Sequence, residues 1–544
     1  MALRSISDLA EELQLPNEQV ERYGNDRAKI DMEVATTRPL AGKLILVSAI
    51  TPTPSGEGKT TTSISLAQGM KHQGHRVALA LREPSMGPVF GRKGGATGGG
   101  KSTVVPSDRI NLHFNGDFHA ITAAHNLISA CIDNQLHFRQ SRLDPGRILW
   151  KRVMDGNDRS LRSILVGLQG NGVARESGFD ITAASEIMAI LCFAETMEDL
   201  RQRIDAILLG FDSKWDPVYA RELKITGAIM ALLRDAMKPN LVQSLEGVPA
   251  IIHGGPFANI AHGCNSVLAT KTALGGADYV VTEAGFAFDL GGEKFFDIKC
   301  RIAGLDPAAI VLVATIRALK MHGGKALKEI TDPDPGAVEA GLENLEAHIE
   351  GASHFQRPIV VAVNRFSTDA PDEIRVVESF CREKGITCVH SDGYASGGPG
   401  AADFADAVVE AASQTSPALE FLYPSNAESI PDKIEAVARK LYGADGVRLS
   451  SVAEKRLKRI QKLGLSHLPV CIAKTQDSLS DDPTKLGRPK GFQITVRDFE
   501  IASGAGFIIA LTGDLLRMPA LPKIPAAESV DVDADRHISG LMAG

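Results

Sequence analysis

Long apolar runs are missing from this sequence of 544 residues. No apolar stretch of roughly 18 residues occurs, which argues against a membrane-spanning helix. The N-terminal segment MALRSISDLAEELQL carries charges throughout and lacks the apolar core of a secretory signal. The seven cysteines are odd in number, widely spaced and without a C-x-x-C pair, so we expect no disulfide framework. These absences favour a soluble protein of a reducing compartment, and we expect a cytoplasmic location.

A strong charge of either sign is also absent. The chain has 59 Lys and Arg against 66 Asp and Glu, a formal net charge of -7. Such a balance provides no global attraction to nucleic acid or to an anionic membrane, and we expect neither as a partner. Hydrophobic residues make up 44% and charged residues 23%, which is ordinary globular composition. A chain of this length exceeds a single core, so we expect two or three domains.

Short apolar runs predict the strands of a sheet. They lie at residues 44–50, 76–81, 278–282, 310–315 and 358–363. Their β-branched residues mostly do not alternate with polar ones, which is typical of strands covered on both faces. Because helical patterns separate these runs, we predict an α/β fold with a mostly parallel sheet.

The sequence also contains one long helical pattern and two irregular, proline-containing segments. Apolar residues three or four apart over 184–208 predict a helix that faces the core. The segments TDPDPG at 331–336 and YPSN at 423–426 do not fit the interior of a helix or strand. We therefore expect domain boundaries near them, which gives the segments 1–330, 331–422 and 423–544.

Two glycine-rich segments compete as the phosphate-binding loop. GATGGGKS at 95–102 matches G-x-x-x-x-G-K-[ST] strictly, whereas TPSGEGKT at 53–60 has threonine for the first glycine. A phosphate loop works because a strand delivers it to the N-terminus of a helix, where free N–H groups converge. The loop 53–60 follows a strand pattern and precedes an amphipathic helical pattern that ends at Gly74, but β-branched residues and Pro106 follow 95–102. We therefore predict that 53–60 is the nucleotide loop.

The chemistry of such loops assigns the roles within it. Gly56 and Gly58 allow close backbone approach to phosphates, Lys59 reaches the β/γ oxygens and the Thr60 hydroxyl is a Mg²⁺ ligand. Pro54 removes one N–H donor. The predicted ATP-binding residues are Thr53, Pro54, Ser55, Gly56, Glu57, Gly58, Lys59, Thr60 and Thr61.

An arginine and a carboxylate end the next predicted strand. Arg82 and Glu83 directly follow the run 76–81, which we expect to lie next to the strand that precedes the loop. Ligands of open α/β sheets bind at this carboxyl edge. Arg82 could clamp a second anion such as an acyl phosphate. The alternative is an Arg–Glu pair on the surface.

Long blocks of the sequence resemble formate–tetrahydrofolate ligases, also called 10-formyltetrahydrofolate synthetases. The most specific block begins LREPSMGPVFGRKGGATGGGKSTVVP at Leu81 and is followed by INLHFNGDFHAI at 110–121. Further similar blocks lie at 243–266, 282–301, 316–324, 471–492 and 503–522.

The resemblance implies a P-loop NTPase-like fold with two smaller α/β domains. Segment 1–330 would bind nucleotide and carry out catalysis, 331–422 would contribute to the folate cleft, and 423–544 would form a C-terminal domain. It implies that formate attacks the γ-phosphate of Mg-ATP to give formyl phosphate and ADP, after which tetrahydrofolate takes the formyl group. The family also implies a homotetramer and a possible response to monovalent cations.

The resemblance also implies roles for individual residues. Lys59 and Arg82 would hold the transferring phosphoryl group and formyl phosphate. Glu83 and Asp117 would line the same pocket, orienting formate or relaying a proton. No protein nucleophile is implied, which agrees with the lack of a nucleophile-elbow or Cys–His motif in the sequence.

Two aromatic residues correspond to the pair that sandwiches the pterin ring in the family. They are Phe286 in TEAGF and Tyr394 in GYASGGPGA, where the family usually has tryptophan. Tyrosine can stack on a flat ring, with less area than tryptophan. Without the resemblance, either aromatic residue would rather belong to the core.

Other candidate sites stay open at this point. The turn SGAGF at 503–507 is a candidate adenine site or an ordinary turn. The spacing of His253, His262 and Cys264 is no recognised zinc motif. A basic segment is a candidate for contacts with a folate polyglutamate tail; it contains Lys474, Lys485, Arg488 and Lys490.

Two rival classes share the phosphate loop. One is another P-loop enzyme, such as an ATP-dependent carboxylase or an amide-forming synthetase. The other is a switch ATPase that changes partners with its nucleotide state. The absence of a long amphipathic or coiled-coil segment disfavours the switch ATPase, and the blocks around Arg82 and at 282–301 disfavour both.

Overall fold

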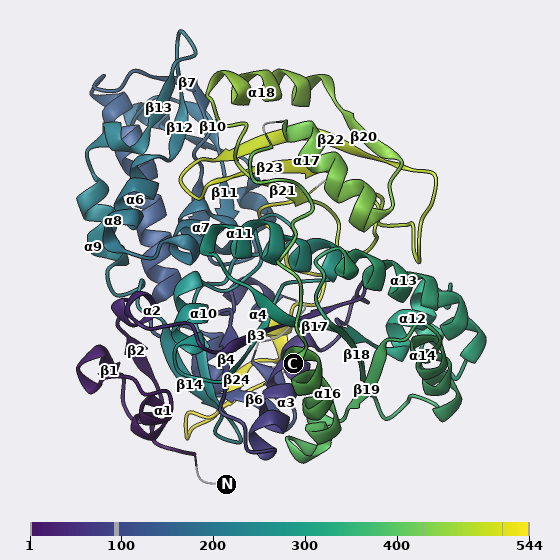
Figure 1. Ribbon diagram of the computed structural model, residues 1–544. Helices are drawn as coiled ribbons and strands as arrows, with labels where there is room; N and C mark the ends of the chain where they lie inside the picture. The colour runs from purple at the N-terminus through teal and green to yellow at the C-terminus, as the bar shows by residue number, and fades with distance from the viewer. Residues whose placement is uncertain (1–2, 92–96, 428, 514, 542–544) are drawn as a thin grey trace.

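A twelve-stranded sheet forms the centre of the molecule (Figure 1). The computed structural model describes residues 3–91, 97–427, 429–513 and 515–541. Neighbouring strands are parallel along the central part of the sheet. In spatial order these strands are β15 (Pro249–Ile252), β4 (Val77–Leu81), β16 (Tyr279–Glu283), β3 (Lys43–Ala49), β17 (Pro307–Ala314), β18 (Ile359–Asn364) and β19 (Thr387–Ser391).

Antiparallel strands extend the sheet beyond β15. β14 pairs with β15, and both β2 and β6 pair with β14. The outer strands are β1 (Val20–Arg22), β2 (Ala28–Ile30), β5 (Gly98–Gly99), β6 (Ser102–Val105) and β14 (Asn240–Ser244). The predicted α/β fold with a mostly parallel sheet is confirmed, and all five predicted strands are present.

Both faces of the parallel strands are covered, as the apolar runs indicate. Leu44 and Leu46 of β3 pack into one hydrophobic cluster, and Ile45 and Val47 pack into a second one on the opposite face. Successive side chains of a strand point to opposite faces. A strand that is apolar at every position therefore has to be buried from both sides.

Helix α3 (Lys59–His72) lies in the second cluster, packed on the sheet and beside α16 (Ala402–Ser413), which covers neighbouring strands. Every residue from Thr61 to Met70 is buried, so the expectation of an amphipathic helix is wrong, although the helix itself is present. Its close packing depends on Gly69, because a Cβ there would lie 2.4 Å from the carbonyl oxygen of Ala401. The other cluster contains residues of α6 (Asp117–His137), α7 (Glu186–Phe193) and α10 (Val267–Leu274).

The predicted helix over 184–208 is interrupted. α7 ends at Phe193, α8 (Met197–Asp205) begins after a break, and Leu208 starts strand β12 (Leu208–Asp212). The break has a local cause, because the hydroxyl of Thr196 accepts a hydrogen bond from the N–H of Asp199 and caps α8. The predicted core stripe is buried except at Met197, which is half-buried.

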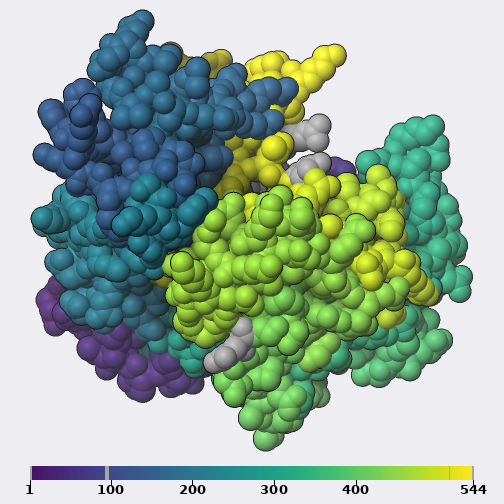
Figure 2. Space-filling view, turned by 90° about the horizontal axis from the view of Figure 1, so that it is seen from above, coloured from purple at the N-terminus to yellow at the C-terminus, as the bar shows by residue number. Residues whose placement is uncertain are grey.

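A separate four-stranded sheet is formed by the C-terminal part of the chain. Its order is β20 (Gly446–Leu449), β22 (Gln493–Ala502), β23 (Phe507–Thr512) and β21 (Val470–Ala473), accompanied by α17 (Ile430–Val437) and α18 (Ser451–Lys462). A three-stranded sheet of β13 (Pro217–Tyr219), β12 and β7 (Leu143–Ile148) lies beside α18 at the top of Figure 1. Figure 2 shows the blue surface of the 140–220 region meeting the green and yellow surface of the C-terminal part.

The proline-rich segment 331–336 leads directly into a helix. Asp334 caps α13 (Pro335–Ser353) by accepting a hydrogen bond from the N–H of Ala337 at 2.9 Å, and Pro335 occupies the first helical position, where proline is tolerated. Strands β18 and β19, which follow this segment, hydrogen-bond into the main sheet. The assignment of 331–422 to a domain of its own stays a prediction.

Two further expectations concern the chain as a whole. All seven cysteines carry free thiols. Within the described residues, no helix is both long and apolar enough to cross a membrane.

Candidate active site

The loop at 53–60 connects β3 to α3, as predicted. Gly56 and Gly58 have φ angles of 80° and 70°, a region that glycine adopts readily. Gly58 is the N-cap of α3 and has no side chain that could bond the first N–H groups of the helix. These donors and the positive end of the helix dipole therefore remain available to an anion.

The carboxyl group of Glu57 holds this loop from inside. It accepts hydrogen bonds from the N–H of Thr53 at 2.6 Å and from the Thr315 hydroxyl. The amide of Asn364, at the end of β18, donates to the carbonyl oxygen of Glu57 at 3.1 Å. Burial raises the pKa of Glu57. The Glu57 side chain thus faces the protein interior, and its contribution to nucleotide binding would come from the backbone.

A carboxylate that the sequence interpretation missed links the loop to Arg82. Glu283, the last residue of β16, accepts a hydrogen bond from the Thr60 hydroxyl at 2.8 Å and contacts the Arg82 guanidinium at 3.4 Å. The expectation that the strand before Arg82 adjoins β3 is wrong, because β16 lies between β4 and β3. The intervening strand therefore brings Thr60, Glu283 and Arg82 together at the carboxyl edge of the sheet.

Arg82 is about one-fifth exposed and held at both ends of its guanidinium. One nitrogen donates to the carbonyl oxygen of Pro256 at 3.3 Å, and the other contacts Glu283. Pro256 belongs to the glycine-rich loop that follows β15. The interpretation of Arg82 as half of a surface Arg–Glu pair with Glu83 does not agree with this geometry.

Glu83 and Asp117 lie in a buried acidic cluster. One carboxyl oxygen of Glu83 is buried and has no hydrogen-bond partner among the described residues. Burial, together with the nearby Asp117, raises the pKa of Glu83 well above its usual value. This shift favours the protonated form of Glu83, which can donate as well as accept a hydrogen bond.

The carboxylate of Asp117 is hydrogen-bonded to other side chains of the protein. Its two carboxylate oxygens accept hydrogen bonds from the ammonium of Lys29 and from the amide of Asn240, each at 2.7 Å. Both Lys29 and Asp117 are buried. This buried ion pair links the N-terminus of α6, where Asp117 is the first helical residue, to strand β2.

The two aromatic candidates follow different strands of the same edge. Phe286 comes after β16, is half-buried and has a φ of 59°, whereas Tyr394 follows β19 on α15 (Gly393–Ser396) and is 57% exposed. β3, β17 and β18 separate β16 from β19 in the sheet order. The two rings can stack on one pterin only if their loops reach over these strand ends, and the pairing stays a prediction.

The strict match at 95–102 lies partly outside the described residues, because 95 and 96 belong to the gap. Its described end enters β6 at Ser102, so a strand and not a helix directly follows Lys101. The N–H of Lys101 donates to the carbonyl oxygen of Tyr394 at 2.9 Å. The end of the segment therefore contacts α15 and lacks the strand–loop–helix context of a nucleotide loop.

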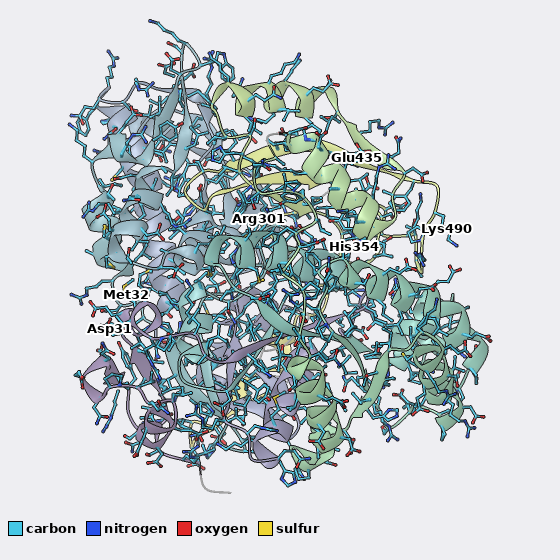
Figure 3. The ribbon with its side chains drawn as sticks, viewed as in Figure 1. Asp31, Met32, Arg301, His354, Glu435 and Lys490 are labelled. Carbon is cyan, nitrogen blue, oxygen red and sulfur yellow. The ribbon has the colours of Figure 1, made fainter. Side chains whose placement is uncertain are left out.

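The expectation for the basic segment is wrong at Lys474. Its ammonium is fully buried and forms an ion pair with Asp289 at 2.9 Å, so it cannot meet a ligand at the surface. Arg488 is paired with Glu346 and Glu350. Lys485 is exposed, and so is Lys490, which lies at the periphery of the molecule (Figure 3).

The side chains of His253 and His262 contact other residues of the protein interior. The two ring nitrogens of His253 hydrogen-bond to the Ser266 hydroxyl at 2.7 Å and the Ala236 carbonyl at 2.6 Å. His262 packs against Phe193 with ring centroids 4.3 Å apart. No cluster of three or more potential ligands occurs among the residues searched, which are the described ones.

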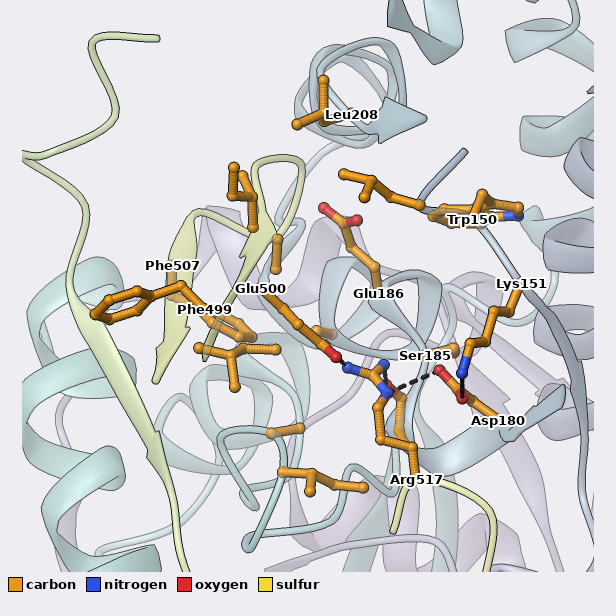
Figure 4. A pocket seen from close by; sticks show the side chains of 18 of the residues that line it. Trp150, Lys151, Asp180, Ser185, Glu186, Leu208, Phe499, Glu500, Phe507 and Arg517 are labelled. Atoms are coloured by element: carbon orange, nitrogen blue, oxygen red, sulfur yellow. Dashed lines mark hydrogen bonds and ion pairs between the residues drawn. The ribbon is translucent and has the colours of Figure 1, made fainter. Parts of the chain in front are cut away.

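The turn SGAGF joins β22 to β23 at a cavity of about 210 Å³ (Figure 4). The N–H groups of Gly504 and Ala505 donate to the carboxyl of Glu186 at 2.7 and 3.3 Å, and burial raises the pKa of Glu186 to about 7. Arg517 pairs with Asp180 and Glu500 on another wall of the same cavity. No residue of the loop at 53–60 lines this cavity, so these contacts favour the interpretation of 503–507 as an ordinary turn.

The site residues that the sequence did not predict differ in how much local signal they carry. Glu283 follows the apolar run 278–282, so its place at a strand end was visible, but the strand order was not. Lys29 and Asn240 carry no local motif and meet Asp117 only through the pairing of β2 with β14.

The whole chain also matches a known family. The family model described as "Formate--tetrahydrofolate ligase" matches residues 1–542. Neither a switch ATPase nor another kind of P-loop synthetase agrees with a match of that extent. The chain therefore belongs to the formate–tetrahydrofolate ligase family of enzymes, which act in tetrahydrofolate-dependent one-carbon metabolism.

Proposed function

We propose that this protein ligates formate to tetrahydrofolate through formyl phosphate, with cleavage of ATP to ADP and phosphate. The observation that carries the proposal is the hydrogen-bonded series Thr60–Glu283–Arg82, which joins a phosphate loop to an anion-binding arginine at one sheet edge. A reaction that transfers a phosphoryl group to a small anion needs these two sites side by side.

In the first step, a formate oxygen attacks the γ-phosphorus of ATP and the bond to the bridging oxygen breaks, which releases ADP. The N–H groups at the start of α3 and the ammonium of Lys59 would hold the phosphates. Arg82 would neutralise charge on formate and on the transferring group with its planar fork. Glu283 keeps the guanidinium pointing toward the loop by accepting its hydrogen bond.

In the second step, a tetrahydrofolate nitrogen attacks the formyl carbon, the carbon–oxygen bond to phosphate breaks, and the departing phosphate takes up the proton that the nitrogen loses. The Glu83 carboxyl, whose protonated form is favoured by burial, would donate a hydrogen bond to a formate or formyl oxygen. Asp117 would act by position, because its oxygens are occupied by Lys29 and Asn240. Phe286 and Tyr394 are the proposed stacking surfaces for the pterin ring.

The residues at the loop fit a magnesium ion. The Thr60 hydroxyl and the Glu283 carboxylate lie 2.8 Å apart, and oxygen ligands of this kind suit Mg²⁺. When bound with ATP, the ion would neutralise charge on the phosphate oxygens. We further propose a cytoplasmic homotetramer that responds to monovalent cations, as the family resemblance implies.

The test is ADP release by the purified protein with Mg-ATP, with formate and tetrahydrofolate added singly and together. Turnover should require both, and acid should convert the product to an absorbing methenyl-folate. ATP hydrolysis that is indifferent to both substrates would refute formyl transfer.

A further inference from the structure

A cavity of about 360 Å³ lies between helix α18 and the sheet β13-β12-β7. Its lining contains four cationic side chains and, among the described residues, no acidic one. The cations are Arg147, Lys455, Arg456 and Arg459. The lining contains no residue of the nucleotide loop, and it contains neither Arg82 nor Glu83. The cavity is therefore distinct from the candidate active site.

Only two of these cations have carboxylate partners. Arg456 binds Asp498 with two hydrogen bonds of 3.1 Å, and Arg147 lies 3.4 Å from Asp144. Lys455 and Arg459 form no ion pair with any residue that the structure describes. The lining thus keeps two uncompensated positive charges beside two that are paired.

Aromatic rings hold Arg459 in place. Its guanidinium carbon lies 3.7 Å from the ring centroid of Trp215 and 4.8 Å from that of Phe211. Arg147 approaches the same Trp215 ring at 4.0 Å. Stacking on aromatic faces leaves the edge of a guanidinium, with its N–H donors, free for a planar anion.

The crowding of cations has an electrostatic cost. Burial, followed by the charges of Arg456 and Arg147, lowers the pKa of Arg459. Arginine nevertheless stays protonated, so the repulsion is not removed by loss of a proton. A bound anion would relieve it, and the fork of Arg459 matches two oxygens of a carboxylate or phosphate.

We propose that this cavity binds a small molecule with two or more adjacent anionic groups, either phosphates or carboxylates. One group would meet Arg459 and the next would meet Lys455, one helical turn away on the same face of α18. The proposal does not depend on formyl transfer, because its test measures binding without turnover.

Two probes distinguish the sources of the anion: inorganic triphosphate and a tetraglutamate peptide. Binding to the full chain is measured by calorimetry and by tryptophan fluorescence, at low and at moderate ionic strength. Trp215 is 43% exposed and is one of two tryptophans, the other being the buried Trp150. A fluorescence change that disappears in Trp215→Phe assigns the signal to this cavity.

The decisive variant is the double substitution Lys455→Gln/Arg459→Gln, and Lys458→Gln on the same helix is the matched control. Lys458 is exposed and does not line the cavity. We expect the double variant to weaken binding about tenfold for each cation removed, and the control to leave it unchanged. Triphosphate can also bind at the nucleotide loop. That binding is distinguished from binding in the cavity because these substitutions leave it unchanged.

The site is supported if either probe, or both, binds the wild-type protein and loses this binding in the double variant. If only one probe does so, that probe identifies the anion. Three results would overturn it. They are no binding of either probe, equal binding by the wild-type protein and the double variant, and an equal loss in Lys458→Gln.

Discussion

Replacing Glu283 by glutamine tests the link between the loop at 53–60 and Arg82. The substitution keeps the volume of this buried side chain but removes its charge. An amide presents one oxygen and two N–H donors, so it cannot accept from both the Thr60 hydroxyl and the Arg82 guanidinium with equivalent oxygens. One of the two partners, most readily Arg82 at 3.4 Å, then loses its acceptor and its fixed direction.

The size of the effect follows from the bonds that are lost. A hydrogen bond that involves a charged group contributes about 1.5–3 kcal/mol. If that amount is lost from the transition state, kcat/KM falls about 10- to 150-fold. We expect a fall within this range in the rate of ADP release with formate and tetrahydrofolate both present.

The control is Glu195→Gln, which breaks a partly buried pair with Lys271 at 2.6 Å away from the sheet edge. It should change the midpoint of thermal unfolding without a comparable loss of rate. A Glu283→Gln protein that folds normally and keeps kcat/KM within about twofold of the wild-type value, a difference of about 0.4 kcal/mol, would refute the proposed link.

Three further predictions concern stability. Lys29→Met leaves Asp117 as a buried charge without its ammonium partner, and we expect about 3–5 kcal/mol of destabilisation in urea unfolding; an unchanged midpoint would contradict the buried pair. Gly69→Ala places a Cβ 2.4 Å from the carbonyl oxygen of Ala401 and should cost about 1–3 kcal/mol, measured in the same way. The free energy of unfolding of the Glu83→Gln protein should rise relative to that of the wild-type protein as the pH rises above the unfolded carboxyl pKa. The reason is that the raised pKa of Glu83 makes the folded wild-type protein bind more protons than the unfolded chain, so its stability falls as the pH rises; a pH-independent difference would contradict this.

Local patterns in the sequence determined the elements around the site. Apolar runs without alternation predicted five strands of the main sheet, because a strand buried on both faces has no polar face to show. Strand, glycine turn and helix start are contiguous in the chain, so the context of the loop at 53–60 could be recognised and the strict match at 95–102 set aside. The break at Thr196 also had a local cause, but a capping threonine inside an apolar stripe was outweighed by the periodicity of the stripe.

Tertiary structure alone decided which strand ends meet. β16 inserts between β4 and β3, and that order brings Glu283 to Thr60 and Arg82 from 223 and 201 residues away. It also buried Lys474 against Asp289 and joined Lys29 to Asp117, although lysines are usually exposed. The physical reason is that periodicity and propensity act over a few neighbouring residues, whereas strand order and charge pairing are set by contacts between segments distant in the chain.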